Sequence, residues 1–412
     1  MIGKAIREAI DFFGRQEKPF KVNLVRAASH YFLSSLSQQY QSLYVVGLGA
    51  TPLQLGLVNS VGGIADASIS MPSGWLADRW GIRKMFLLGT PLMALGALIF
   101  ALAPDWTITV PAIFVTMLSM RWVMTACPMV CGSYLKNEER ATGMQLCDTL
   151  SAVPGLISPI VAAMIITGFG GLNTEGIRPL YYLQVIGFAL IFVFISKQYV
   201  DTVKRGSSRS STGFVGDMRE VFARGTRVRT WIAITSLSTV SMFMSSTYLS
   251  VFAAEVKQAD QFVLGGMATA SMLVPLMLSL LVGRLADTIG RKKVIYLTTP
   301  LYCLSVVLLI YAPDTTTLLV SGVLQGFFML SGVTQGAMTA ELMPVPLLGR
   351  WYGILGIFRG LASVIGPIIG GLVWSTIGPV YVFVFIILIQ ISRLIILGFG
   401  MPETLRARQP SH

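Results

Sequence analysis

Two carboxylates and two arginines stand inside long runs of apolar residues, where ionisable groups are rare. The acids are Asp66 and Asp148, and the bases are Arg121 and Arg359. An ionisable side chain inside a bilayer is costly and is therefore a functional candidate. A buried carboxylate changes its affinity for protons with its access to water and with its neighbours. We predict that Asp66 or Asp148 binds and releases a proton and that Arg121 tunes it. The alternative is a set of fixed ion pairs that only position helices.

A second set of polar residues lies at helical spacing near the N-terminus. The steps of four, four, four and three place Arg26, His30, Ser34, Gln38 and Gln41 on one continuous helix face. We expect His30, Ser34, Gln38 and Gln41 to line a substrate cavity, together with Arg359 of a later run. The alternative for these polar residues is plain helix packing. For His30, proton sensing and packing both stay open.

Soft apolar residues complete the expected cavity walls. Methionine adapts to varied lipophilic ligands and is also a common core filler. The methionines in question are Met120, Met124, Met144, Met242, Met244, Met267 and Met272. A patch of small polar residues is expected on the seventh helix, at Ser238, Thr239, Ser241, Ser245, Ser246 and Ser250.

The composition places these residues in an all-α membrane protein. The chain has 412 residues, of which 54% are hydrophobic and 12% are charged. Runs of about twenty mostly apolar residues, long enough to cross a bilayer as helices, recur from end to end. The twelve predicted spans are 22–47, 54–77, 84–103, 107–133, 141–168, 178–198, 228–253, 261–283, 294–312, 316–342, 350–375 and 378–400.

The basic residues predict the orientation of these spans. An even number of spans puts both termini on one side. If that side is the cytosol, 26 of the 31 lysines and arginines fall in inner segments, Arg26 being counted with the N-terminal stretch. Such a bias is typical of cytosolic loops. The net charge of +12 then reflects topology and contact with anionic lipid, and nucleic acid is not an expected partner.

The spans group into two halves around one long polar stretch. We expect an amphipathic cytosolic segment at 1–21, a six-helix bundle at 22–198, a cytosolic linker at 199–227, a second six-helix bundle at 228–400 and a cytosolic tail at 401–412. The Gly/Ser-rich start of the linker is typical of a flexible connection.

The two halves repeat at a constant offset. "SGWLADRWGIRKM" (73–85) and "VGRLADTIGRKKV" (282–294) place Gly74 and Gly283 209 positions apart (283 − 74), and the aspartates and glycines that follow keep this offset. "RATG" (140–143) and "RWYG" (350–353) agree within a residue. The repeat predicts two pseudo-symmetric bundles with parallel topology, a transporter architecture with its site between the halves near the midplane.

The repeated loop resembles the signature loop of the major facilitator superfamily, which lies between the second and third helices. "GLASVIGPIIGG" (360–371) resembles the glycine-proline motif of that family's eleventh helix, and "PIVAA" (159–163) is a weaker copy on helix five. The resemblance spans about residues 30–400. It implies two six-helix bundles that alternate in access to the two sides of the membrane.

The resemblance implies a gating role for the loop. It places Asp78 against the start of helix eleven, near Arg350, where a helix N-terminus and an arginine favour a carboxylate. That contact would latch the halves together on the cytosolic side. The alternative is a charged turn that only follows the charge bias, and Asp287 is the structural counterpart of Asp78 more than a second gate.

The glycines of the loop have separate expected roles. Gly74 and Gly283 allow close helix approach, and Gly81 and Gly290 allow the tight turn. The predicted gating residues are Gly74, Asp78, Arg79, Gly81, Arg83, Lys84, Gly283, Asp287, Gly290, Arg291, Lys292 and Arg350.

The resemblance also bears on the charges inside the membrane. It pairs helix two with helix eleven, so Asp66 and Arg359 are expected to meet as a salt bridge between the halves. Arg121 lies where drug/proton antiporters carry a helix-four arginine motif, although Thr125 stands where that motif has glycine.

The sequence favours transport over chemistry. No nucleotide-binding loop, nucleophile triad or metal cluster is evident, so we expect no enzyme, no cofactor and no metal site. The favoured function is proton-coupled export of small amphipathic compounds. One alternative is transport of a small organic anion or metabolite held by Arg121 and Arg359, and another is a receptor or scaffold that transports nothing. We expect a monomer in the cell membrane, in contact with lipid, with both termini in the cytosol.

Overall fold

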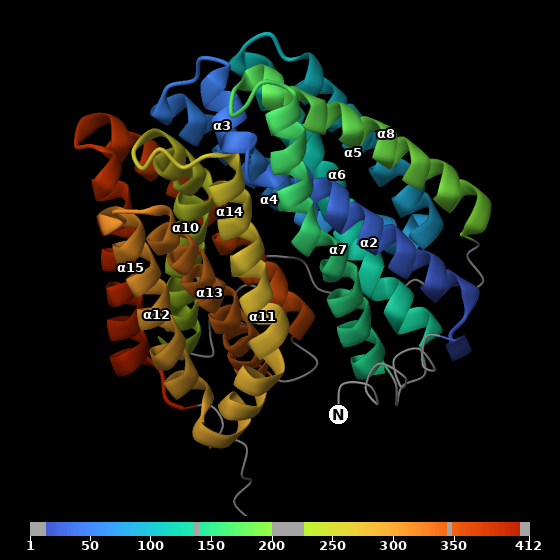
Figure 1. Ribbon diagram of the computed structural model, residues 1–412. Helices are drawn as coiled ribbons and strands as arrows, with labels where there is room; N and C mark the ends of the chain where they lie inside the picture. Colours follow the sequence, from blue (N-terminus) through green and yellow to red (C-terminus); the bar gives the residue numbers. More distant parts are fainter. Residues whose placement is uncertain (1–13, 136–139, 200–225, 344–347, 404–412) are drawn as a thin grey trace, which may run out of the picture. The chain divides into compact units, whose positions relative to one another are not determined.

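The structure, a computed structural model, describes residues 14–135, 140–199, 226–343 and 348–403, and all regular elements in these ranges are helical (Figure 1). Side chains are also left undescribed at several helical positions, among them 74–79, 125 and 348–350. Twelve helices of these ranges have 21 residues or more. Ten of them are long and apolar enough to cross a membrane.

The long helices follow the predicted spans closely. They are α2 (Lys18–Gln38), α4 (Pro52–Trp80), α5 (Ile82–Leu102), α6 (Thr109–Tyr134), α7 (Arg140–Gly168), α8 (Thr174–Gln198), α10 (Thr226–Glu255), α11 (Gln261–Ile289), α12 (Arg291–Tyr311), α13 (Thr315–Glu341), α14 (Leu348–Thr376) and α15 (Pro379–Gly400). A short helix, α3 (Gln41–Gly47), follows α2, and a 3₁₀ turn, η1 (Trp106–Ile108), precedes α6. The all-helical membrane fold that the sequence predicts is confirmed.

The first predicted span is interrupted. One helix was expected over 22–47, but α2 ends at Gln38 and α3 begins at Gln41. Tyr40 lies between them, fully buried, and its hydroxyl donates a hydrogen bond to the Pro159 carbonyl oxygen at 3.3 Å. This tertiary contact accompanies the break, and nothing in the local sequence marks it.

The turns between helices keep the sequence repeat. Gly81, between α4 and α5, has φ of 82°, and Gly290, between α11 and α12, has φ of 112°. Positive φ favours glycine, because a side chain is strained there. Asp105 and Asp314 also lie 209 positions apart, and each accepts a backbone N–H of the following turn at 2.8 Å. Both halves therefore use the same residues to stop and restart helices.

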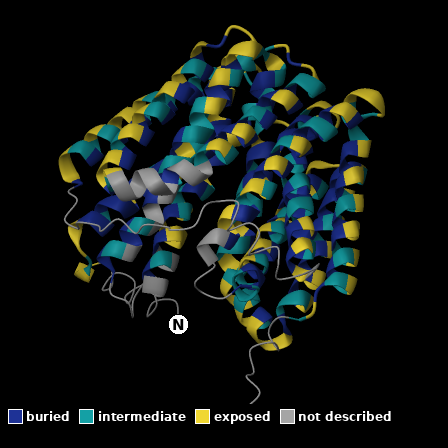
Figure 2. Ribbon diagram, turned by 180° about the vertical axis from the view of Figure 1, so that it is seen from behind, coloured by how far each residue is buried: buried dark blue, intermediate teal, exposed yellow. Residues whose placement is uncertain are grey.

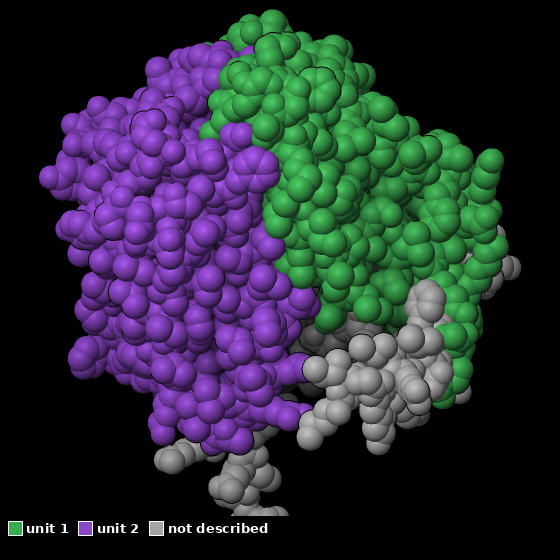
Figure 3. Space-filling model, in the orientation of Figure 1, with its two compact units in different colours: residues 1–41, 68–209 green, residues 42–67, 210–412 purple. Residues whose placement is uncertain are grey.

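The chain divides into two compact units (Figure 3). Unit 1 holds residues 1–41 and 68–209, and unit 2 holds residues 42–67 and 210–412. The first part of α4, up to Ala67, thus belongs to unit 2, and the rest belongs to unit 1. The predicted bundle limits at 22–198 and 228–400 stay a prediction. Most of the expected linker (200–225), the start of the N-terminal segment (1–13) and the end of the tail (404–412) lie outside the described residues.

Helix packing inside the two units is matched. In unit 1, α2 packs on α7 and α8, and α5 packs on α6 and α8. In unit 2, α10 packs on α14 and α15, and α12 packs on α13 and α15. These are the same four choices of partner, shifted by one half of the chain. The duplication seen in the sequence therefore extends to the packing of each unit.

Exposed side chains recur along the full length of the helices and are largely apolar (Figure 2). Leu190 in unit 1 is 65% exposed, and Met277 and Leu280 in unit 2 are 72% and 74% exposed. Large apolar side chains at such exposure suit contact with lipid, since water would disfavour a surface of this kind.

Candidate functional site

Unit 1 contains a cavity of about 100 Å³ between α2, α6 and α7. It brings one acid and one base together in an otherwise largely apolar wall. The lining residues are Arg26, Ala27 and Tyr31 of α2, Met124 and Cys131 of α6, and Met144, Asp148 and Ser151 of α7. A mostly apolar cavity with a few convergent polar groups is typical of small-molecule sites.

Arg26 is held in the cavity wall by contacts with residues of α2 and α5. Its residue is 2% exposed, and its Nε donates a hydrogen bond to Asn23 Oδ1 at 3.1 Å. Its guanidinium carbon lies 4.4 Å from the centre of the Phe86 ring of α5, a cation–π distance. Asn23 also approaches Cys147 Sγ of α7 at 3.9 Å. Arg26 is therefore a buried residue of α2 that packs on α5, although it was counted above with the cytosolic basic stretch.

Asp148 is an exposed residue of α7, beside the buried Cys147. It shares the cavity with Arg26, and a positive charge close to a carboxylate favours the ionised form. The apolar walls around the pair favour the neutral carboxylic acid. A carboxyl under two opposed influences can change its charge when the cavity fills or empties, which is the chemistry that proton exchange requires.

The other predicted proton residues lie elsewhere. Arg121 of α6 is half-buried and is not among the described residues that line the cavity. Asp66 of α4 is half-buried in unit 2, and Arg359 of α14 is exposed in the same unit. The assignment of Asp66 and Arg121 to proton coupling stays a prediction.

The residues predicted to form one substrate face on the first helix differ in burial and belong to two helices in the structure. His30 is 3% exposed and packs on Phe188 of α8, with ring centres 5.9 Å apart. Ser34 is half-buried, Gln38 is exposed at the end of α2, and Gln41 belongs to α3 beyond the break. None of these four lines the cavity described above. Their role in binding stays a prediction.

The residues that line the cavity from α2 and α7 carry a signal that the sequence analysis passed over. Ala27 and Tyr31 are four apart, and Met144, Asp148 and Ser151 follow at steps of four and three. Side chains at these spacings share one helix face. A search for faces that combine one acid with methionine and small polar residues would have found this face of α7.

In each unit a buried glutamine holds one helix, α2 in unit 1 and α10 in unit 2. Gln184 Nε2 of α8 donates hydrogen bonds to the Leu33 carbonyl oxygen at 2.6 Å and to Ser37 Oγ at 2.8 Å. In unit 2, Gln390 Nε2 of α15 donates to Ser241 Oγ of α10 at 2.8 Å. These glutamines were not among the residues predicted from the sequence. Both hold a helix that the repeat places at the same position in its half.

Unit 2 adds a buried arginine to this arrangement. Arg393 of α15 is fully buried and donates hydrogen bonds to Gln390 Oε1 at 2.7 Å and to Ser331 Oγ of α13 at 3.1 Å. The guanidinium therefore joins α15 to α13, and does not extend to the membrane surface. Part of the polar patch expected on the seventh helix, Ser241, packs in this network.

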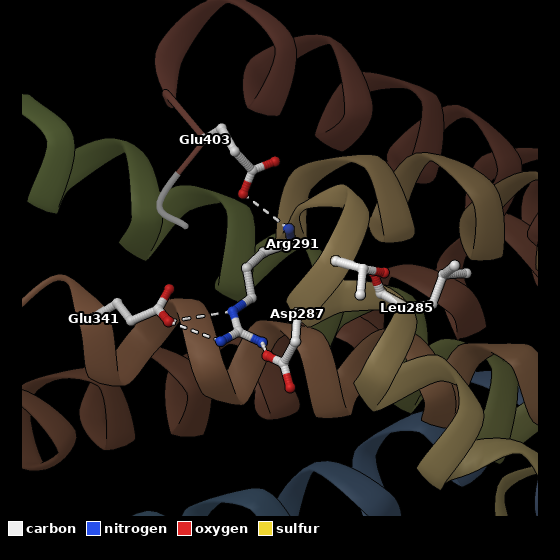
Figure 4. A network of polar contacts seen from close by, with 6 residues as sticks. Leu285, Asp287, Arg291, Glu341 and Glu403 are labelled. Atoms are coloured by element: carbon white, nitrogen blue, oxygen red, sulfur yellow. Dashed lines mark hydrogen bonds and ion pairs between the residues drawn. The ribbon is translucent and has the colours of Figure 1, made fainter. Parts of the chain in front are cut away.

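The loop of unit 2 is held by three carboxylates (Figure 4). Arg291 Nη1 lies 2.7 Å from Asp287 Oδ1, and its Nη2 lies 3.0 Å from Glu341 Oε1. Glu403 accepts the backbone N–H groups of Arg291 at 2.8 Å and Lys292 at 3.1 Å. Lys292 Nζ donates to the Gly398 and Met401 carbonyl oxygens. All these partners belong to unit 2, which supports a structural role for Asp287.

The predicted close helix approach at Gly283 stays a prediction. A Cβ added there would meet no described atom within 4 Å. The tight-turn role of Gly290 agrees with its positive φ. Close helix approach in unit 2 occurs at other glycines, in α4 and α14.

The loop of unit 1 is described only in part. Arg83 Nη2 donates to the Ser196 carbonyl oxygen at the end of α8 at 3.0 Å, and Lys84 is exposed. The surroundings of Gly74 and the side chains of Asp78, Arg79 and Arg350 lie outside what the structure describes. The predicted latch between Asp78 and Arg350 therefore stays a prediction.

Comparison with known proteins gives a consistent result. The family model of the Major Facilitator Superfamily matches residues 24–268 and 231–411. The multidrug resistance protein MdtG of Enterobacter lignolyticus (strain SCF1) is 23% identical over 394 residues, which are 92% of this chain and 90% of that protein. The multidrug resistance protein 2 of Bacillus subtilis (strain 168) is 26% identical over 316 residues, 74% of this chain and 75% of that protein.

A solved structure shares the fold. The crystal structure of the nucleoside transporter NupG superposes with a TM-score of 0.77 at 15% identity, and the match covers 93% of this chain and 99% of NupG. At this identity the likeness concerns the fold alone.

Proposed function

Because this chain belongs to the Major Facilitator Superfamily of membrane transporters, we propose that it exports small amphipathic compounds in exchange for protons, by alternating access. The relatives named multidrug resistance proteins support export of varied compounds. The observation that carries the proposal is the cavity of unit 1, where Asp148 and Arg26 face a wall of tyrosine, methionine and cysteine.

Asp148 is the proposed exchange site. In its ionised form it attracts a cationic or polarised group of a substrate, and in its protonated form it does not. A proton and such a substrate therefore compete for one carboxylate, which is the requirement for exchange. Arg26 keeps the empty site from holding its proton too tightly, because its charge favours the ionised form.

The walls of the cavity suit the apolar part of the substrate. Met124 and Met144 are flexible and polarisable, and Tyr31 offers an aromatic face. Such walls repack around ligands of different shapes, a property of promiscuous binding surfaces. We propose that both units contribute to the complete substrate site, with Asp78 and Arg350 forming the cytosolic latch.

The proposed setting follows the charge bias of the sequence. The chain is a multi-pass membrane protein, and we place it in the cell membrane as a monomer with both termini in the cytosol.

Transport by the purified full chain in liposomes tests the proposal. Ethidium serves as the amphipathic cationic probe, and a trapped dye reports the internal pH. A pH gradient is expected to drive ethidium movement with a counterflow of protons. Asp148→Asn is expected to lose most of the gradient-driven rate, because the amide cannot exchange a proton.

Asp314→Asn is the matched control. It removes the same charge from an exposed turn, where asparagine still caps the helix, so transport is expected to be unchanged. Full gradient-driven transport by Asp148→Asn would refute the role of Asp148. A wild-type chain that moves an organic anion such as benzoate, and not ethidium, would favour the anion carrier. A wild-type chain that moves neither would favour a receptor.

A further inference from the structure

Unit 2 contains a tight contact between α4 and α14. We call it the α4–α14 seam and define it as Leu53–Ala67 of α4 with Gly360–Gly371 of α14, both parts of unit 2. A Cβ added to Gly63 would lie 2.6 Å from Ser363 Oγ, and one added to Gly371 would lie 2.8 Å from Leu53 Cα. Helices approach this closely where glycines and other small residues face the partner.

Hydroxyl groups bond backbone carbonyls across the seam. Ser60 is 3% exposed, and its Oγ donates a hydrogen bond to the Val364 carbonyl oxygen at 2.7 Å. Tyr248 of α10 is fully buried, and its hydroxyl lies 2.8 Å from the Pro367 carbonyl oxygen and 3.0 Å from the Pro52 carbonyl oxygen. Pro52 is the first residue of α4, so the single proton of this α10 hydroxyl is shared between one carbonyl of α4 and one of α14.

The position of the Tyr248 hydroxyl is fixed from within unit 2. Its ring lies 5.6 Å from Trp374 of α14, and a Cβ added to Gly370 would overlap the ring. The ring contacts and the Pro367 contact therefore join α10 to α14 alone, and they are kept when α4 moves away. The Pro52 contact is different, because α4 continues from the seam into the part of unit 1 that starts at Ser68.

We infer that Tyr248 is a positioning residue for transport, whose hydroxyl holds the first turn of α4 against the proline turn of α14 and must release Pro52 each time the seam opens. The inference rests on the proposed function, because only a transporter that alternates has to open the seam. Removing the hydroxyl alone is then expected to favour the open seam without unfolding the unit.

The accessibility of a buried seam residue tests this inference. Ser363 is 3% exposed and faces Gly63, so the thiol introduced by Ser363→Cys reports opening when a small water-soluble methanethiosulfonate reacts with it. The full chain without this substitution gives the background from native cysteines. A net hydrogen bond is worth about 1 kcal/mol, so Tyr248→Phe is expected to raise the labelling rate about fivefold.

Tyr296→Phe is the matched control. Its hydroxyl also donates to a backbone carbonyl, that of Leu394 at 2.7 Å, but this bond joins α12 to α15 away from the seam. We expect its labelling rate to equal that of the parent. An unchanged rate in Tyr248→Phe, or an equal rise in Tyr296→Phe, would overturn the inference.

The two proposals fail in distinguishable ways, because labelling requires no substrate and no proton gradient. Faster labelling in Tyr248→Phe of a chain that moves no ethidium would support the seam contact and reject the exporter. Active ethidium transport with unchanged labelling would reject the seam contact alone. Thermal unfolding in detergent checks that Tyr248→Phe stays folded, and Gly371→Ala supplies a second variant that is expected to wedge the seam open.

Discussion

The same turn occurs at residues 74–84 in unit 1 and 283–293 in unit 2, and the two copies hold their backbone by different chemistry. In unit 2, Asp287 pairs with Arg291 one helical turn later, and Glu403 caps the following helix. In unit 1, the position that corresponds to Arg291 is Ile82, which is 2% exposed. Duplication has kept the glycine turn, whereas the arginine that pairs with Asp287 in unit 2 is replaced by isoleucine in unit 1.

The loop of unit 2 pairs its aspartate with an arginine four residues later, whereas the loop of unit 1 has no arginine at the corresponding position. The charge of Asp287 is compensated inside unit 2. Asp78 has isoleucine at that place, so its charge can serve another contact, in agreement with the proposed latch.

Arg291→Met is expected to have the largest effect on stability. It leaves Glu341, whose side chain is 14% exposed, without its partner, while the Asp287 side chain is 62% exposed and is already screened by water. We expect a loss of about 2 kcal/mol, less than for a fully buried pair. Thermal unfolding in detergent measures it, with exposed Lys293→Met as the control. Equal stability of both variants would show that the Glu341 contact contributes little.

Glu403→Ala is expected to have the next largest effect. It removes the acceptor for two backbone N–H groups at the start of α12, where Gly290 has no capping side chain. Loss of a helix cap costs about 1 kcal/mol. Hydrogen exchange at the first turn of α12 should rise, whereas the first turn of α5 should be unaffected. A rise in both turns would mean that the effect is general unfolding.

Arg83→Ala is expected to cost only a few tenths of a kcal/mol, because its hydrogen bond to the Ser196 carbonyl oxygen is exposed. Thermal unfolding compares it with Lys292→Ala, which removes two such bonds in unit 2 and should be more destabilising. The reverse order would contradict the view that unit 2 has the more firmly held loop.

The smallest effect concerns the aspartate caps, where the two halves agree. Hydrogen bonds from the Thr107 hydroxyl and backbone hold the pKa of Asp105 below its ordinary value, and those from Thr317 do the same for Asp314. A lowered pKa means that the cap stabilises the fold above the ordinary carboxyl pKa and loses this contribution as the pH falls through the folded pKa. Between about pH 5 and pH 3, Asp105→Asn and Asp314→Asn should each reduce the acid-induced fall in melting temperature by the same small amount. Unequal reductions would show that the two caps differ.

The sequence predicts the helices well because the apolar runs are long and glycines mark their ends. The predicted span 261–283 stops six residues short of the end of α11 at Ile289. Charged residues such as Arg284 and Asp287 suggested a loop, but the helix continues through them until Gly290, where φ becomes positive. Charge identifies the edge of the membrane, whereas backbone geometry identifies the end of the helix.

The site was predicted less completely, because it depends on which helix faces meet. Asp148 stood out as an acid in an apolar run. Its cavity also contains Arg26, which was counted with the cytosolic basic stretch, because the sequence does not tell which faces of α2, α6 and α7 meet. The tuning role of Arg121 stays a prediction. The assignment of residues 42–67 to unit 2 is likewise a matter of contacts between distant segments.

The contact of Glu403 also sets a rule for handling the protein. This carboxylate returns to a turn 112 residues earlier in the chain, immediately after the last helix has ended. A fluorescent reporter or purification tag should therefore be joined downstream of residue 403, with a spacer that leaves the carboxylate in place. A fusion made directly to the end of α15 would remove the cap from α12 and lower the yield of folded protein for reasons unrelated to transport.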